Sequence, residues 1–163
     1  MAVKTAEPAA VDVSIEIAAT PHAIVDAFFD AAALARWCGA LRSVTTPRVL
    51  GPYAIEWASD MRDDVLGRLG GVLRGTVMHF EPTRGFLVAD VFWLPPAGHP
   101  VGPMALEVTC RRTPTRDGTP LTKVRVTQSG FEEGERWRRY YDVIGPEWQR
   151  GMELLKGLLE KPS

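Results

Sequence analysis

Residues 132–160 of the chain read EEGERWRRYYDVIGPEWQRGMELLKGLLE. The apolar side chains of this stretch recur three or four residues apart, which is the spacing of one face of an α-helix. They are Trp137, Tyr141, Ile144, Trp148, Met152, Leu155 and Leu159. A helix of this length spans about 40 Å, so the rest of the chain has to cover a long aromatic stripe.

The pair Gly145-Pro146 interrupts this helix near its middle. Proline lacks a backbone N–H and clashes with the carbonyl four residues earlier. We therefore expect a kink near residues 142–145. One kinked helix is favoured because the apolar stripe keeps its phase through the proline, and two helices joined by a turn are the alternative.

The composition is typical of one globular domain. The chain has 163 residues, of which 45% are hydrophobic and 24% charged, and a formal net charge of -1. This charge argues against a nucleic-acid or anionic-membrane partner. Neither a signal peptide nor a run of eighteen apolar residues is present, so we expect a cytoplasmic protein without a membrane span. We expect residues 1–10 to be a flexible N-terminus and residues 11–163 to form a single domain.

The first elements of the domain follow from alternation and capping residues. Residues 11–17 alternate between apolar and polar side chains, which predicts a half-buried strand. Thr20 can cap a helix whose first residue is Pro21. Asp30 can cap a second short helix that ends near Gly39.

The remainder of the chain reads mainly as strands. Residues 59–71 are a charged connection with a local helical turn, and Ser129 with Glu132 can form a capping box for the long helix. Together with the first strand, this pattern predicts an α+β fold in which a six-stranded antiparallel sheet packs against the long helix. The five predicted strands are at 53–57, 72–80, 86–94, 104–111 and 124–128.

Several short phrases, in order along residues 11–160, resemble the START-like, or SRPBCC, superfamily. In particular they resemble the family of homologues of the heat-shock-chaperone ATPase activator. The phrases are Ala19-Thr20-Pro21, Trp37, Gly75-Thr76-Val77, Leu121-Thr122-Lys123-Val124, Gln128-Ser129-Gly130-Phe131, and Trp148 followed by Leu154-Leu155-Lys156. The resemblance implies the helix-grip fold, a curved sheet wrapped around the C-terminal helix with a cavity between them for an apolar ligand. Many relatives have histidine where this chain has Gln128.

Aromatic side chains are the main candidates for ligand contacts. Six of them are expected at the interface between sheet and helix: Trp37, Tyr53, Trp57, Trp93, Tyr141 and Trp148. Their indole and phenol groups need hydrogen-bond partners, which a ligand or cavity water can supply. A solid core is the alternative, because periodicity alone does not exclude it.

Gln128 is the polar candidate. Its strand is expected to turn it inward, next to the start of the long helix, and a buried amide has to be hydrogen-bonded. Either the ligand or another group of the protein can be its partner.

The residues that could bind metal are scattered. His22, His79 and His99 lie far apart, and neither they nor Cys38 and Cys110 have the spacing of a metal site. We predict no metal, no cofactor, no catalytic residue and two free thiols. His79 faces either the cavity or the solvent.

Asp90 interrupts an apolar strand. If Leu87, Ala89, Val91 and Trp93 face inward, Asp90 faces the solvent. The opposite register would bury the carboxylate and raise its pKa, which could make it an acid or a base.

These patterns leave three hypotheses for function. The first is a non-enzymatic protein that binds an apolar or aromatic molecule of lipid, steroid or polyketide type. The second is an enzyme of the polyketide cyclase or aromatase type, which would use Gln128, Tyr53, Tyr141 or a buried Asp90. The third, implied by the family resemblance, is a chaperone-associated interaction domain, and we rank it last. A homodimer is compatible with all three.

Overall fold

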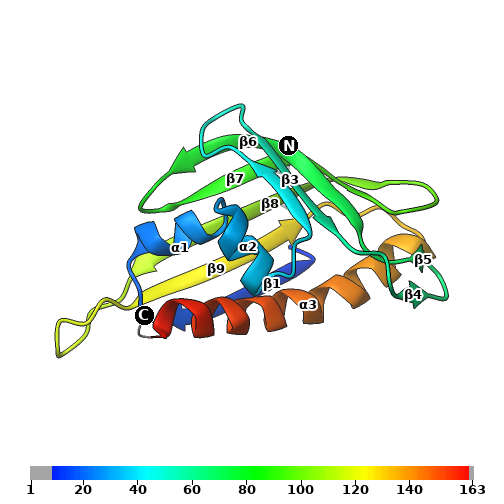
Figure 1. The fold of residues 1–163 in the computed structure, drawn as a ribbon. Coiled ribbons are helices and arrows are strands. Elements are labelled where there is room, and N and C mark those ends of the chain that lie inside the picture. Colours follow the sequence, from blue (N-terminus) through cyan, green and yellow to red (C-terminus); the bar gives the residue numbers. More distant parts are fainter. Residues whose placement is uncertain (1–8, 162–163) are drawn as a thin grey trace, which may run out of the picture.

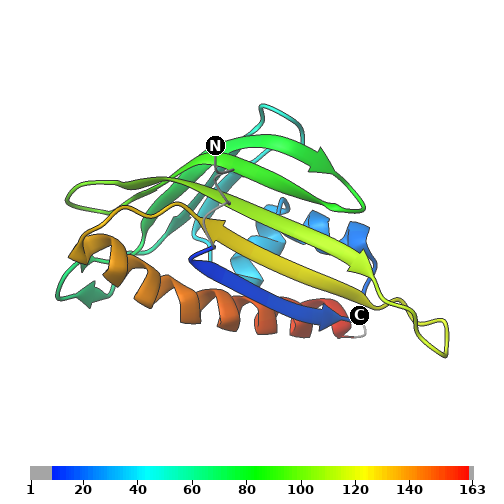
Figure 2. The same cartoon turned by 180° about the vertical axis from the view of Figure 1, so that it is seen from behind.

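The computed structural model describes residues 9–161 and contains three helices on one face of a large sheet (Figures 1 and 2). The first eight residues of the predicted flexible N-terminus lie outside this range. The helices are α1 (Pro21–Ala27), α2 (Ala31–Trp37) and α3 (Glu135–Glu160). The strands are β1 (Val11–Ile17), β2 (Arg42–Thr45), β3 (Pro52–Trp57), β4 (Arg62–Asp63), β5 (Gly67–Arg68), β6 (Gly71–Glu81), β7 (Gly85–Leu94), β8 (Val101–Arg112) and β9 (Thr122–Ser129).

Seven strands form one antiparallel sheet in the order β1-β9-β8-β7-β6-β3-β2, and its concave face holds the helices (Figures 1 and 2). The side chains alternate accordingly: Val124 and Val126 of β9 are buried, whereas Lys123 and Arg125 are exposed. The α+β helix-grip architecture predicted from the sequence is thus confirmed.

The two short helices begin where their capping residues predict. The Thr20 hydroxyl accepts a hydrogen bond from the Ala23 amide at 3.2 Å, and the Asp30 carboxylate accepts one from Ala33 at 2.9 Å. These bonds satisfy amides that have no partner within the helix. In the sequence α1 and α2 lie between β1 and β2, and in space they lie across the concave face of the sheet.

Two predictions in the middle of the chain are wrong. The sheet has seven strands rather than six, because β2 pairs with β3 at the edge of the sheet. The sequence gives little sign of this four-residue strand, whose Val44 is 61% exposed. Within residues 59–71, the β4–β5 hairpin spans residues 62–68 in place of the expected helical turn. Gly67 and Gly70 have positive φ angles, which differ from those of a helix.

The register predicted for β7 is also wrong in its first half. Val88 is fully buried opposite Leu106 of β8, so Leu87 faces outward. A bulge at 89–90 then shifts the alternation, which leaves Val91 buried and Asp90 exposed with a φ of 51°. Asp90 therefore faces the solvent, as predicted, but through an irregularity that a regular alternation does not anticipate.

Gly75 of β6 lies against this bulge. A Cβ atom at this position would come within 2.7 Å of Val88 Cγ1 and 2.8 Å of the Ala89 carbonyl oxygen. Only glycine lets β6 and β7 approach so closely. The pairing shifts between Arg74 and Thr76, so both strands are irregular where the sheet curves.

The long helix continues through Pro146 as a single element, and its axis bends in both views (Figures 1 and 2). The alternative of two helices is therefore wrong. The predicted capping box does not form, because Ser129 stays in β9 and the helix begins only at Glu135, after Gly134 with a φ of 146°. Met152 and Leu155 of the predicted stripe are fully buried.

The interior is closely packed at its α1 end by an aromatic cluster. Phe28 packs edge-on against Trp37 and Phe86, with ring centroids 4.9 and 5.4 Å apart. Phe29 packs in the same way against Tyr53, Phe80 and Phe86. This end of the interface between sheet and helices matches the alternative of a solid core.

Candidate functional site

A cavity of about 750 Å³ lies between the concave face of the sheet, the end of α2 and the middle of α3. This volume falls in the range of small-molecule binding sites. Its aromatic walls are Trp37, Tyr53, Trp57, Trp93, Tyr140 and Trp148, and its aliphatic walls are Ile55, Leu66, Leu69, Leu73, Leu106, Val143 and Ile144. A second hollow, of about 310 Å³, lies at the turn formed by residues 112–121, where the lining residues are mostly exposed and none is aromatic.

Five of the seven residues predicted from the sequence line the cavity. Gln128 and Tyr141 do not. Tyr141 packs beside Phe131 and Trp137, and its hydroxyl donates to the Gly130 carbonyl at 2.5 Å. Its neighbour Tyr140, which is 4% exposed, takes the place on the wall.

Tyr140 was missed because the apolar stripe was traced through Trp137 and Tyr141. A second path with helical spacing runs through Tyr140, Ile144, Trp148 and Gly151, all of which line the cavity. The sequence contains both paths, and a helix that bends can turn either of them toward the sheet at a given point.

Four of the wall rings hold their polar atoms away from the cavity. Each of them donates to a backbone carbonyl of the protein, at 2.7 to 2.8 Å. The pairs are Trp37 with Ala27, Tyr53 with Phe28, Trp57 with Cys38, and Trp93 with Gly70. These groups therefore need neither a ligand nor water, contrary to the expectation from the sequence, and the rings contribute apolar surface.

Gly70, whose carbonyl accepts the Trp93 hydrogen bond, has no space for a side chain. It has a φ of 89°, and a Cβ atom there would lie 2.2 Å from the Ala58 carbonyl oxygen. A larger residue would displace the carbonyl that receives the Trp93 indole. The glycine thus fixes the orientation of one wall.

Gln128 supports the wall from behind. Its side chain is fully buried, and its Oε1 accepts a hydrogen bond from Trp148 Nε1 at 2.9 Å. Its Nε2 lies 3.0 Å from the Tyr140 hydroxyl and 3.3 Å from Met104 Sδ. Of the two partners expected for the Gln128 amide, a ligand or another group of the protein, the structure therefore shows groups of the protein.

Arg136 links the loop of residues 95–100 to the Trp93 ring. Arg136 of α3 donates to the His99 carbonyl at 2.5 Å, and its guanidinium lies 5.9 Å from the centroid of the Trp93 ring. This contact is within the range of a cation–π interaction. It holds the loop to the first turns of α3.

The mouth of the cavity is bordered by exposed residues from three segments. They come from the end of α2, from residues 58–61 and from the second half of α3. Arg36, Asp60, Glu147 and Arg150 give this rim both signs of charge, and Glu147 pairs with Arg150 at 2.5 Å. Met61 and Leu154, 65% and 51% exposed, add apolar surface to the rim.

The two thiols are unsuited to nucleophilic chemistry. Both are free, and burial raises the pKa of Cys38 to about 11 and that of Cys110 to about 12. His22 and His79 have mainly exposed side chains, beside Asp26 and Glu81. Among residues 9–161, no three His, Cys, Asp or Glu side chains gather as metal ligands would.

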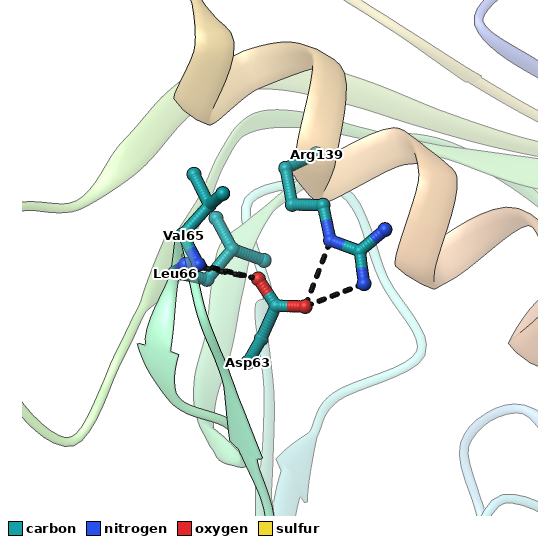
Figure 3. Close-up of polar contacts among 4 residues, drawn as sticks. All are labelled: Asp63, Val65, Leu66 and Arg139. Carbon is teal, nitrogen blue, oxygen red and sulfur yellow. Dashed lines mark hydrogen bonds and ion pairs between the residues drawn. The ribbon is translucent and has the colours of Figure 1, made fainter.

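The β4–β5 hairpin, which supplies Leu66 to the wall, is fastened to α3 by Asp63 (Figure 3). The Asp63 carboxylate accepts hydrogen bonds from Arg139 at 2.6 and 2.7 Å, and from the Val65 and Leu66 amides at 3.1 and 3.0 Å. The Arg139 hydrogen bond and then these amides lower the pKa of Asp63 to about 2. One carboxylate thus both shapes the hairpin and holds it to the helix.

We expect Asp63→Asn to loosen the hairpin and to make the free energy of unfolding less dependent on pH in the acid range. The folded-state pKa of Asp63 is depressed below its ordinary value of 3.8. Its ion pair therefore stabilises the fold above about pH 4, and this contribution is lost as the pH falls toward 2. The difference in unfolding free energy between wild type and variant should shrink as the pH falls from 4 through 2, and be lost below the folded-state pKa of about 2.

Asp12→Asn is the matched control, because Asp12 forms a bidentate pair with Arg125 on the outer face. Amide exchange at Leu66, measured near neutral pH, should accelerate in Asp63→Asn and stay unchanged in Asp12→Asn. Equal exchange in both variants would contradict the role of Asp63 in fastening the hairpin.

No protein-family model matches the chain, and no curated protein matches it either. Solved structures do resemble it over nearly its whole length. A protein of Mesorhizobium loti, known from its crystal structure, has a TM-score of 0.62 at 25% identity, and the match covers 93% of this chain and 98% of that chain. The Aha1 dimer from Colwellia psychrerythraea has a TM-score of 0.58 at 19% identity, with 92% and 95% covered.

A third structure is DynU16, described as a putative protein in the dynemicin biosynthetic locus. It has a TM-score of 0.53 at 18% identity, and the match covers 93% of this chain but 47% of that one. At such identities the Aha1 and DynU16 structures are similar to this chain in fold only. Within residues 9–161 no helix has the length and apolar character needed to cross a membrane.

Proposed function

Because the chain has the helix-grip fold of the START-like superfamily, we propose that it binds an apolar or aromatic small molecule between the sheet and α3. The observation that carries the proposal is the cavity of about 750 Å³, in which four of the wall rings donate their polar groups to backbone carbonyls of the protein. Apolar surface of this kind favours a ligand of lipid, steroid or polyketide type. The proposed contacts are the rings of Trp37, Tyr53, Trp57, Trp93, Tyr140 and Trp148.

We favour the binding hypothesis over the alternative of a cyclase- or aromatase-type enzyme. Such an enzyme needs polar groups that face the reacting atoms. Tyr53 donates to a backbone carbonyl, Gln128 lies behind the wall, and Asp90 is on the outer face of the sheet. The side chains proposed for catalysis are thus engaged within the protein or distant from the cavity.

Two further suggestions about partners stay predictions. The Colwellia neighbour is described as a dimer, which is a statement about that protein, and a homodimer of this chain remains to be measured. A chaperone-associated role rests on the family resemblance alone. The cavity offers no support for it.

The binding proposal predicts that filling the cavity weakens the binding of an apolar probe. N-phenyl-1-naphthylamine, a neutral dye that fluoresces in apolar surroundings, should bind the wild type in one saturable site. Leu73→Trp combined with Ile144→Trp brings an indole in from each of two walls, β6 and α3. Affinity should fall about tenfold or more, since overpacking costs about 1–3 kcal/mol.

Leu158→Trp is the control, because Leu158 is on the same helix, half-buried, and outside the cavity lining. It should leave probe affinity unchanged. Circular dichroism establishes that each variant is folded. Wild-type affinity in the folded double variant would mean that the dye binds elsewhere, and the proposal would be wrong.

A further inference from the structure

The hydroxyl of Tyr140 differs from the other polar groups of the cavity wall. The Tyr140 ring lines the cavity beside Trp93, with centroids 5.5 Å apart, and the residue is 4% exposed. A buried hydroxyl almost always has partners for its hydrogen-bonding groups. The role of this one follows from the bonds around Gln128.

Trp148 determines the orientation of the Gln128 amide. An indole N–H can only donate a hydrogen bond, so the atom of Gln128 facing Trp148 has to be the oxygen. The amide nitrogen then faces Tyr140 at 3.0 Å. Because that nitrogen can only donate, the Tyr140 oxygen is the acceptor.

The proton of the Tyr140 hydroxyl is consequently not used in the hydrogen bond with Gln128. Within residues 9–161 it has no acceptor, whereas the side-chain donors of Trp37, Tyr53, Trp57, Trp93 and Trp148 all have one. Burial raises the pKa of Tyr140, so the hydroxyl keeps its proton at neutral pH. Tyr140 thus combines a place on the wall with an unused donor.

We infer that the Tyr140 hydroxyl donates a hydrogen bond to an oxygen of the ligand, and so selects apolar molecules that carry a carbonyl or ether oxygen over plain hydrocarbons. The inference rests on the proposed function, since it names the polar contact within the same cavity. A hydrocarbon in contact with Tyr140 would leave the buried donor without a partner, which lowers its affinity.

Fluorenone and fluorene test this selectivity, because they share one three-ring skeleton and differ in a single carbonyl. We expect the wild type to bind fluorenone about fivefold or more tighter than fluorene, as measured by titration calorimetry or tryptophan quenching. In Tyr140→Phe the two affinities should become equal through a loss for fluorenone alone. The carbonyl stretch of bound fluorenone should move to higher wavenumber in that variant.

Tyr141→Phe is the matched control. It removes a hydroxyl from the adjacent residue, but that hydroxyl donates to Gly130 and its ring is outside the cavity lining. The preference for fluorenone should persist in it. General damage to the fold would weaken both compounds in parallel, so the ratio of the two affinities isolates the hydrogen bond.

The possible results distinguish failure of the Tyr140 hydrogen bond from failure of the proposed ligand binding. Equal binding of both compounds by the wild type, unchanged in Tyr140→Phe, would overturn the inference and leave the binding proposal standing. It would mean that water accepts the proton. Failure of the folded wild type to bind either compound, or N-phenyl-1-naphthylamine, would overturn both.

Discussion

Replacing Leu34 with alanine is expected to lower the free energy of unfolding by about 4 kcal/mol. Leu34 is fully buried on α2, belongs to the hydrophobic core and lies outside the cavity lining. Its side chain is therefore surrounded by other atoms on all sides. Truncation removes those contacts and creates a new void, which places the cost in the upper part of the usual range for this change.

The same substitution at Leu73 should cost about 2 kcal/mol. Leu73 is nearly as buried, with 4% exposure, but it forms part of the cavity wall. One side of it already faces empty space, so fewer contacts are lost and an existing cavity is only enlarged. Urea unfolding of both variants measures the difference, provided that their m-values agree with that of the wild type.

This comparison tests the hollow interior without any ligand. A loss at Leu73 as large as that at Leu34 would mean that the space between sheet and helix is closely packed in solution. The two residues undergo the same chemical change, so the transfer free energy nearly cancels, while the propensity difference between a helix site and a strand site is about 1 kcal/mol or less. The rest of the difference reflects local packing.

The order of the elements was predictable because it depends on short-range rules. Alternation, or an apolar run bounded by turn residues, located six strands, and the capping residues Thr20 and Asp30 located α1 and α2. The apolar spacing of residues 132–160 located α3 and carried it through Pro146. Each of these signals depends on neighbours within about four residues.

The missed features depend on contacts between distant segments. The bulge at Asp90 occurs where Gly75 brings β6 close to β7. The strand β2 forms by pairing with β3. The choice of Tyr140 over Tyr141 follows from the phase of a bent helix against the sheet. Neither alternation nor spacing reports on these relations.

The roles of the polar atoms were the hardest to predict. The sequence suggested that the indole groups of the wall would seek a ligand or water, and their acceptors proved to be backbone carbonyls of the protein. Trp57 bonds to a residue 19 positions away, and Trp93 to one 23 positions away. Only the folded chain brings such pairs together.

Gln128 is the residue whose replacement should reveal most about the wall. Gln128→Leu roughly preserves volume, and from the sequence it could be taken as neutral for stability. The structure leads to the opposite expectation, because the Trp148 indole would lose its acceptor and Tyr140 its donor. We expect unfolding to become easier by about 2–4 kcal/mol, since each buried group left unpaired costs about 1–3 kcal/mol.

A double-mutant cycle with Trp148→Phe isolates this effect. In Trp148→Phe the indole donor is absent, so the subsequent Gln128→Leu change leaves one fewer group unpaired. The double variant should therefore be more stable than the sum of the single losses predicts, by about 1 kcal/mol or more. Strict additivity, measured by denaturant unfolding, would show that the amide and the indole are independent in solution. The wall would then be held by packing alone, and the orientation that assigns a free proton to Tyr140 would lose its basis.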